Sequence, residues 1–317
     1  MGFALIKVIF QRPLFSIMSF VLLSSFSSCS VFTARNSSET SSENDGRIKS
    51  GTATYRYHDT SGDYQLFKEV GYLKKKNIYF VKTKILPEFG KEGDLLEKSL
   101  TISTLSKLKL GAESRTVDLL RPKTSQYTVW LDGKKYFSQL RVDLKSMGLE
   151  VLAFSPEQKM PKKSSVRLPS GNGVYCFFSQ LAECIKITGF LSMARDKQSG
   201  TMSLQLIWDG YPFYHLMYEN FTPEVVSTAI FEYDGVSEDG ATRFELKTDR
   251  EQSIYFHFDK NNELVKKVWV ARGIEQERNG QSSGSRRGGS GGSGGDKVDD
   301  DRDDPSFKIE QFGPIKG

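Results

Sequence analysis

The sequence lacks the short motifs that usually mark an enzyme. Outside the Gly- and Ser-rich stretch of residues 280–295, its 317 residues contain no G-x-S-x-G elbow, H-E-x-x-H pair, phosphate loop, C-x-x-C pair or dinucleotide fingerprint. Histidine is scarce as well: His58, His215 and His257 are the only three, and no spacing supplies the convergent ligands that a metal site needs. We therefore expect no metal or other cofactor, and we assign no catalytic residue.

A strong excess of charge is also lacking. The formal net charge is +5 at pH 7, which is too small to indicate nucleic-acid binding, because that function usually demands a concentrated basic face. The local runs Lys74–Lys76 and Lys162–Lys163 are typical of solvated turns. We expect no nucleic-acid partner.

The N-terminal segment has the features of an export signal. Lys7 and Arg12 precede the apolar stretch PLFSIMSFVLLSSF, which is too short for a membrane span of about 20 apolar residues. The segment ends in LLSSFSSCS, where two small residues lead directly into Cys29.

This ending resembles the signal peptides of bacterial lipoproteins. The resemblance implies that residues 1–28 are removed, that Cys29 is acylated through its sulfur, and that it becomes the new N-terminus. In that class a serine after the cysteine, here Ser30, goes with sorting to the outer membrane. We expect a cell-envelope protein anchored to the outer membrane on its periplasmic or surface face. The alternative is an ordinary signal peptide with an incidental cysteine.

Composition divides the rest of the chain into three parts. Residues 29–50 are rich in Ser, Asn and Glu and predict a disordered tether, while residues 51–274 predict one β-rich domain. Residues 275–317 predict a flexible tail, because 12 of the 14 residues from Ser282 to Gly295 are Gly or Ser and six aspartates follow between Asp296 and Asp304. The acidic run lacks the spacing of a calcium loop, so a solvated acidic tail is favoured.

Alternation with a period of two dominates the domain. Apolar residues alternate in TMSLQLIW (201–208), RFELKT (243–248) and SIYFHFD (253–259), as expected for half-buried strands. Turn signals such as LDGKK and DKNNE separate these runs and favour hairpins. The fold class predicted is mainly β: a curved antiparallel sheet or incomplete barrel with one or two short helices. The sequence shows no alternation of strand and helix patterns, so a parallel sheet is disfavoured.

One segment predicts a helix and raises a question about its cysteines. VYCFFSQLAECIKI (174–187) places apolar residues on one helical face, and it contains Cys176 and Cys184. A pair of thiols outside the cytoplasm usually forms a disulfide. A continuous helix would separate their Cα atoms by about 12 Å, beyond the ~7 Å that a disulfide tolerates. Either the helix is interrupted and the two bond, or both are buried and free; we favour the disulfide.

Aromatic residues crowd one stretch of the sequence. Tyr211, Phe213, Tyr214, Tyr218 and Phe221 could line an apolar pocket for an acyl chain or contact a partner, although each residue taken alone is more often part of a core. The strand pattern, the hairpin FDKNNELVKKVW and the export context are similar to the open barrels of periplasmic lipoprotein carriers and other lipid-binding envelope proteins. No functional residue can be transferred from that similarity.

Three functional hypotheses follow. A non-catalytic binding module for lipid or lipoprotein predicts a dry concave cavity. A structural or assembly partner of an envelope complex predicts a closed core, an exposed apolar edge and a role for the acidic tail. An enzyme, the least favoured of the three, predicts a cleft in which His58 or His215 meets a carboxylate.

Overall fold

A computed structural model describes residues 50–90, 94–110, 115–169, 173–218, 221, 223–249 and 253–280. The export signal, Cys29, the tether up to residue 49 and the tail from residue 281 lie outside these residues. No helix in the described part of the chain is long and apolar enough to cross a membrane.

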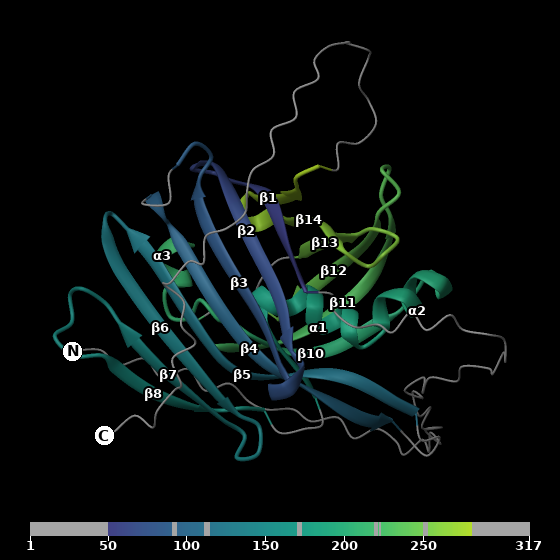
Figure 1. The fold of residues 1–317 in the computed structure, drawn as a ribbon, viewed down its shortest axis with the longest axis horizontal. Coiled ribbons are helices and arrows are strands. Elements are labelled where there is room, and N and C mark those ends of the chain that lie inside the picture. Colours follow the sequence, from purple (N-terminus) through teal and green to yellow (C-terminus); the bar gives the residue numbers. More distant parts are fainter. Residues whose placement is uncertain are drawn as a thin grey trace, which may run out of the picture. The chain divides into compact units, whose positions relative to one another are not determined.

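Fifteen strands of the described residues form one open, curved sheet, in the order β8-β7-β6-β5-β4-β3-β2-β1-β15-β14-β13-β12-β11-β10-β9 (Figure 1). The strands are β1 (Gly51–Asp59), β2 (Gly62–Leu73), β3 (Ile78–Pro87), β4 (Glu97–Leu110), β5 (Arg115–Leu131), β6 (Lys134–Asp143), β7 (Gly148–Phe154), β8 (Lys162–Arg167), β9 (Val174–Phe177), β10 (Thr201–Ile207), β11 (Val226–Val236), β12 (Thr242–Thr248), β13 (Ile254–Phe258), β14 (Leu264–Trp269) and β15 (Ile274–Arg278). The helical elements are η1 (Lys74–Lys76), η3 (Phe178–Gln180), α1 (Leu181–Ile187), α2 (Phe190–Lys197), α3 (Tyr214–Met217) and η4 (Val270–Arg272). The predicted mainly-β fold class is confirmed.

The predicted hairpins form where the alternation indicated. Ile254, Phe256 and Phe258 of β13 all point into the core, and the DKNNE turn leads from them into β14. The run Lys74–Lys76 forms the exposed turn η1, as expected. Lys162 and Lys163 do not lie in a turn, because they open β8, a fully exposed edge strand. Charged side chains on an edge strand discourage pairing with another chain, and this role accounts for two lysines at the start of a strand.

The segment 174–187 is not one helix. Its first four residues form β9, which runs parallel to β10, and the helix α1 begins only at Leu181. Strand is favoured at the start because β9, the last strand of the sheet next to β10, is buried: Tyr175 and Phe177 pack in one core cluster with residues of β6 and β7. The two strands therefore enclose a strand–helix–strand unit that the sequence pattern did not reveal.

This break brings the two cysteines together. Cys176 lies on β9 and Cys184 on α1, with Cα atoms 6.1 Å apart, and they form a disulfide. Both residues are almost fully buried. The bond pins α1 against the strand that precedes it.

The domain ends later than predicted. Residues 275–278 belong to β15, which pairs antiparallel with β1 through Tyr55 and Arg278 at one end and His58 and Glu275 at the other. The boundary expected after Ile274 therefore falls inside a strand, and the described domain continues to Gly280.

Two clusters form the core. The larger one lies inside the curve and centres on Trp208 and Trp269, whose rings stack with centroids 6.0 Å apart. The smaller one joins β6 and β7 to β9 and β10 through residues such as Leu140 and Phe177. The sheet thus curls until its two end regions pack on each other.

We expect loss of the disulfide to lower stability without changing the fold. The double variant C176S/C184S should reduce the free energy of unfolding by roughly 2–3 kcal/mol, because the bond restricts the unfolded chain. Urea unfolding followed by tryptophan fluorescence measures this. Wild-type protein in reducing agent should match the variant, and an unchanged unfolding midpoint in both would contradict the structural role.

Candidate functional site

A cavity of about 80 Å³ lies inside the curved sheet. It is lined by inward-facing residues of β1 to β5 on one side and of β13 to β15 on the other, with η3, α1 and the segment around α3 closing it. Alternation along each strand sends these side chains inward. For example, Ile85 of β3 lies opposite Glu97 of β4, and both line the cavity.

Glu97 is the first charged group of this interior. Its carboxylate accepts a hydrogen bond from the hydroxyl of Tyr127, at 2.9 Å. The pKa of Glu97 is raised to about 7, mainly by burial; the Tyr127 hydrogen bond and Lys267 oppose the rise, and the neighbouring Asp209 adds to it. Glu97 therefore changes its protonation state near neutral pH.

Asp209 is the second charged group of the interior, and it is fully buried two residues after the end of β10. One carboxylate oxygen accepts the backbone N–H of Ser179 at 3.0 Å, whereas the other, Oδ2, has no partner among the described residues. Burial raises the pKa of Asp209 above its ordinary value. Gly210 follows because the Tyr214 ring leaves no room there: a Cβ atom would lie 2.0 Å from it.

Lys267 is the third. It reaches into the cavity from β14 and lies over the Phe178 ring, 5.1 Å from the centroid. Burial lowers the pKa of Lys267 to about 8, and the positive charge of Lys68 adds to the effect. No carboxylate oxygen of the described residues lies within 4.0 Å of its Nζ, although Glu97 and Asp209 both influence its pKa. A space therefore separates this ammonium group from the two carboxyl groups.

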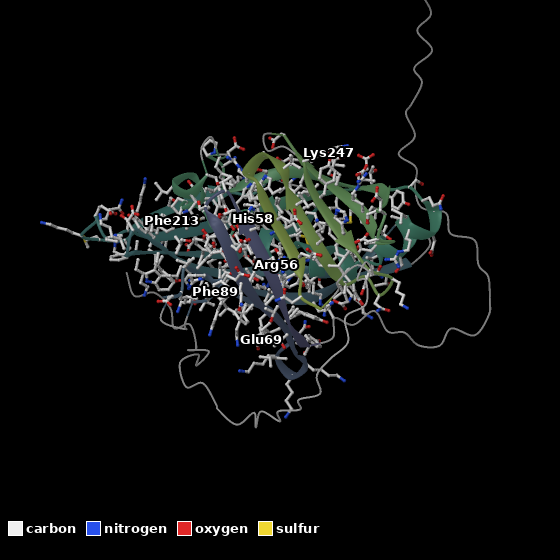
Figure 2. All side chains as sticks on the ribbon, turned by 90° about the horizontal axis from the view of Figure 1, so that it is seen from above. Arg56, His58, Glu69, Phe89, Phe213 and Lys247 are labelled. Atoms are coloured by element: carbon white, nitrogen blue, oxygen red, sulfur yellow. A yellow bond between two sulfur atoms is a disulfide. The ribbon has the colours of Figure 1, made fainter. Side chains whose placement is uncertain are left out.

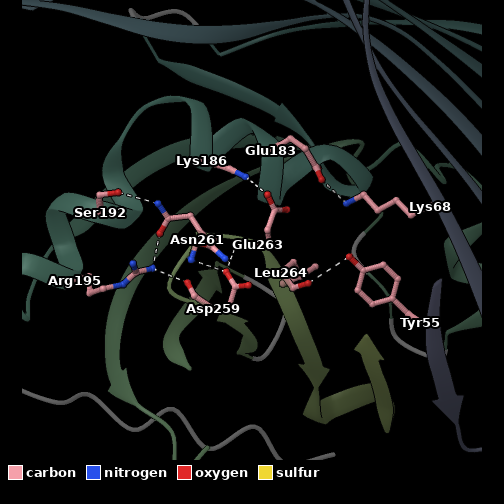
Figure 3. Close-up of polar contacts among 11 residues, drawn as sticks. Tyr55, Lys68, Glu183, Lys186, Ser192, Arg195, Asp259, Asn261, Glu263 and Leu264 are labelled. Atoms are coloured by element: carbon pink, nitrogen blue, oxygen red, sulfur yellow. Dashed lines mark hydrogen bonds and ion pairs between the residues drawn. The ribbon is translucent and has the colours of Figure 1, made fainter. Parts of the chain in front are cut away.

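Lys68, by contrast, has a close partner. Its Nζ lies 2.7 Å from a carboxylate oxygen of Glu183 on α1, and both side chains are largely buried (Figure 3). Burial is the largest single effect and disfavours the charge of Lys68, but Glu183, Tyr55 and Glu263 together outweigh it and the pKa is raised. Beyond this ion pair lies a second cavity, of about 250 Å³, which Lys186, Glu263 and other polar residues line. The pair thus forms part of the wall between the two cavities.

The structure divides the five aromatic residues singled out in the sequence. Phe213, Tyr214 and Phe221 are buried, and Tyr214 and Tyr218 line the 80 Å³ cavity. Tyr211 packs at the boundary of both core clusters. The interior cavity is lined by charged and phenolic groups, so it is not the dry cavity that a lipid-binding module predicted.

An apolar groove does exist elsewhere. Phe213 also lines a surface groove of about 400 Å³ together with Pro212, Leu216, Tyr136 and Ala153. Phe213 lies near one end of the molecule (Figure 2). Of the aromatic stretch, only Phe213 faces this groove.

His58 and His257, the two histidines whose side chains are described, do not line the interior cavity. His58 bonds to Asp63 through Nδ1 at 2.9 Å in the exposed hairpin between β1 and β2, while Asp59 caps the turn through the backbone N–H of Ser61. His257 lies 3.3 Å from the hydroxyl of Ser237, and burial lowers its pKa. The side chain of His215 lies outside the described part. No metal-binding group of three ligands occurs among the described residues.

No protein-family model matches the chain. No curated protein matches it significantly. Among solved structures, a β-barrel-like protein of a domain of unknown function (DUF1849) from Brucella abortus is similar, with a TM-score of 0.31 and 9% identity over 73% of this chain and 97% of that chain.

We expect Glu97 to make stability depend on pH. Because its folded-state pKa is raised from 4.5 to about 7, the folded state keeps a proton that the unfolded state loses, so stability falls as pH rises from 4.5 through 7. The variant Glu97→Gln should remove about 3 kcal/mol of this fall, measured by urea unfolding at pH 4.5 and pH 8.

Glu157 offers a matched control for this measurement. Its carboxylate also accepts a tyrosine hydroxyl at 2.9 Å, from Tyr136, but at the exposed surface. Glu157→Gln should leave the pH dependence as in the wild type. An identical fall in the Glu97→Gln variant and the wild type would refute the role of Glu97.

Proposed function

We propose that this protein is a lipid-anchored, non-catalytic binding module of the cell envelope, and that its interior cavity binds a small zwitterionic molecule. The observation that carries the proposal is one cavity lined by an ammonium group that has no carboxylate in contact and by a carboxylate oxygen that has no hydrogen-bond donor. Lys267 has no contacting carboxylate, and Asp209 Oδ2 has no hydrogen-bond donor, among the described residues. Leaving buried charges uncompensated costs several kcal/mol, so a ligand that pairs with both would recover that cost.

The size of the cavity supports a small ligand. A volume of 80 Å³ corresponds to about five to eight water-sized positions, at roughly 10–15 Å³ each. This number matches the non-hydrogen atoms of a small amino acid, whose carboxylate would face Lys267 and whose ammonium group would face Asp209. An acyl chain is too large and too apolar for the same space.

Neutral hydroxyl groups complete the site. Burial raises the pKa values of Tyr57, Tyr127 and Tyr214 well above their ordinary range, so these phenols stay protonated. Tyr127 donates its hydrogen to Glu97, and its oxygen can still accept a hydrogen bond. Trp269 and Phe178 supply apolar walls. Such a mixture of few polar groups and aromatic walls is typical of small-molecule sites. The described histidines lie outside it, so the hydrolase hypothesis gains no support.

We expect Lys267→Gln and Asp209→Asn each to weaken binding of a small amino acid at least tenfold, about 1.4 kcal/mol, because each removes one charged partner. Isothermal titration calorimetry against a panel of free amino acids measures the affinity. Lys266→Gln is the matched control: Lys266 is the preceding residue, points outward and pairs with Glu275 at 2.6 Å. The proposal fails if no member of the panel binds, or if the control loses as much affinity.

The lipid hypothesis keeps one location, the apolar groove at Phe213 and Leu216, where Leu216 is 52% exposed and Lys162 lies beside it. The groove could hold part of an acyl chain with an acidic headgroup near Lys162. This ligand would occupy a different site from the zwitterion.

Intact mass spectrometry of protein extracted from its native envelope tests the anchor and this groove together. We expect a chain that begins at Cys29 and carries acyl mass. A co-purified lipid that disappears in a Leu216→Asp variant would place lipid in the groove. An unmodified chain without the signal peptide would exclude the anchor.

A further inference from the structure

The outward face of β2 to β7 has an unusual composition. Neighbouring strands place one outward residue each in a continuous row: Phe67, Lys84, Lys98, Thr128, Phe137 and Phe154. Trp130 and Lys135 face each other in the adjoining row. We call Phe67, Lys84, Lys98, Trp130, Lys135, Phe137 and Phe154 the basic aromatic face.

These residues point away from the interior. Each alternates with a residue that faces inward, such as Leu66 before Phe67 or Glu97 before Lys98, and both of those line the cavity. The outward side of an antiparallel sheet is normally polar. Here Phe67 is 41% exposed and Phe154 38% exposed, so large aromatic groups remain in contact with solvent at both ends of the row.

The lysines of this face are gathered against their mutual repulsion. Lys84 lies directly opposite Lys98 on the next strand, a placement that destabilises a sheet. Burial lowers the pKa of Lys98, and the charges of Lys135 and Lys84 lower it further.

Aromatic side chains interleaved with lysines suit an anionic membrane surface. Tryptophan and phenylalanine sit at the level of the headgroups, and lysine side chains extend to negatively charged lipids. Lys98 Nζ lies 6.0 Å from the centre of the Trp130 ring, so cation and ring already share one spot. We propose that the basic aromatic face rests on an anionic lipid bilayer. The proposal is independent of the interior cavity and of any ligand bound there.

Trp130 is a built-in probe for this contact. The chain has three tryptophans, and the other two, Trp208 and Trp269, are buried in the core at 0% and 2% exposure. Full-length protein purified from its envelope is reconstituted into phosphatidylcholine vesicles, with or without phosphatidylglycerol, whose acyl chains carry bromine near the headgroup. We expect bromine to quench part of the emission in the anionic vesicles, and Trp130→Phe to remove that quenchable part.

The charge requirement is tested by the triple variant K84Q/K98Q/K135Q, which should lower the quenching at least threefold. The variant Phe154→Ser should lower it as well, through loss of an apolar contact rather than of charge.

The matched control is K74Q/K75Q/K76Q, which removes the same charge from the exposed turn η1. It should quench as the wild type does. Absence of quenching, equal quenching with neutral lipid, or an equal loss in this control would overturn the proposal. A Trp130 signal that depends on protein concentration without lipid would indicate a second copy on this face, and would overturn it too.

Discussion

The pairing of the first strand with the last holds the described sheet together. β1 to β8 follow one another outward in one direction and β15 back to β9 in the other, so the β1–β15 ladder joins two series of consecutive strands. Tyr55 also extends this link, since its hydroxyl reaches the carbonyl of Leu264, 209 positions along the chain. Bringing such distant segments together costs chain entropy, and the burial of side chains such as Tyr57 and Trp269 behind the ladder offsets it.

The interior that this closure creates contains charges of two kinds. Lys68 and Glu183 satisfy each other and tie α1 to β2, whereas Lys267, Asp209 and Glu97 influence one another across a gap. A buried ion pair is close to neutral for stability, but separated buried charges are a net cost.

The strands were predictable because a two-residue repeat survives without knowledge of tertiary structure, as β13 and β10 illustrate. The interior charges were not predictable from the sequence. Lys267 follows Lys266, and two adjacent lysines are typical of a solvated surface; only the sheet shows that Lys267 lies on the same buried side as Trp269, two residues later. Asp209 stands in a WDGYP turn signal, which conceals its burial. The helical pattern of residues 174–187 predicted a helix over the whole segment, which is right for α1 but wrong for the strand Val174–Phe177. Each miss arises where a distant segment decides the environment.

The ladder between β1 and β15 also brings the beginning and the end of the described domain together, which bears on the order of its strands along the chain. The backbone N–H of Asn279, just after β15, bonds to the carbonyl of Thr54 in β1 at 2.9 Å, so the two ends of the sheet's central seam are close. If these ends were joined and the chain opened between β8 and β9, the strands would follow in sequence from one edge of the sheet to the other. Apart from the parallel β9–β10 crossover, the fold is one meander whose chain begins in its middle, so synthesis completes the central β1–β15 pairing last.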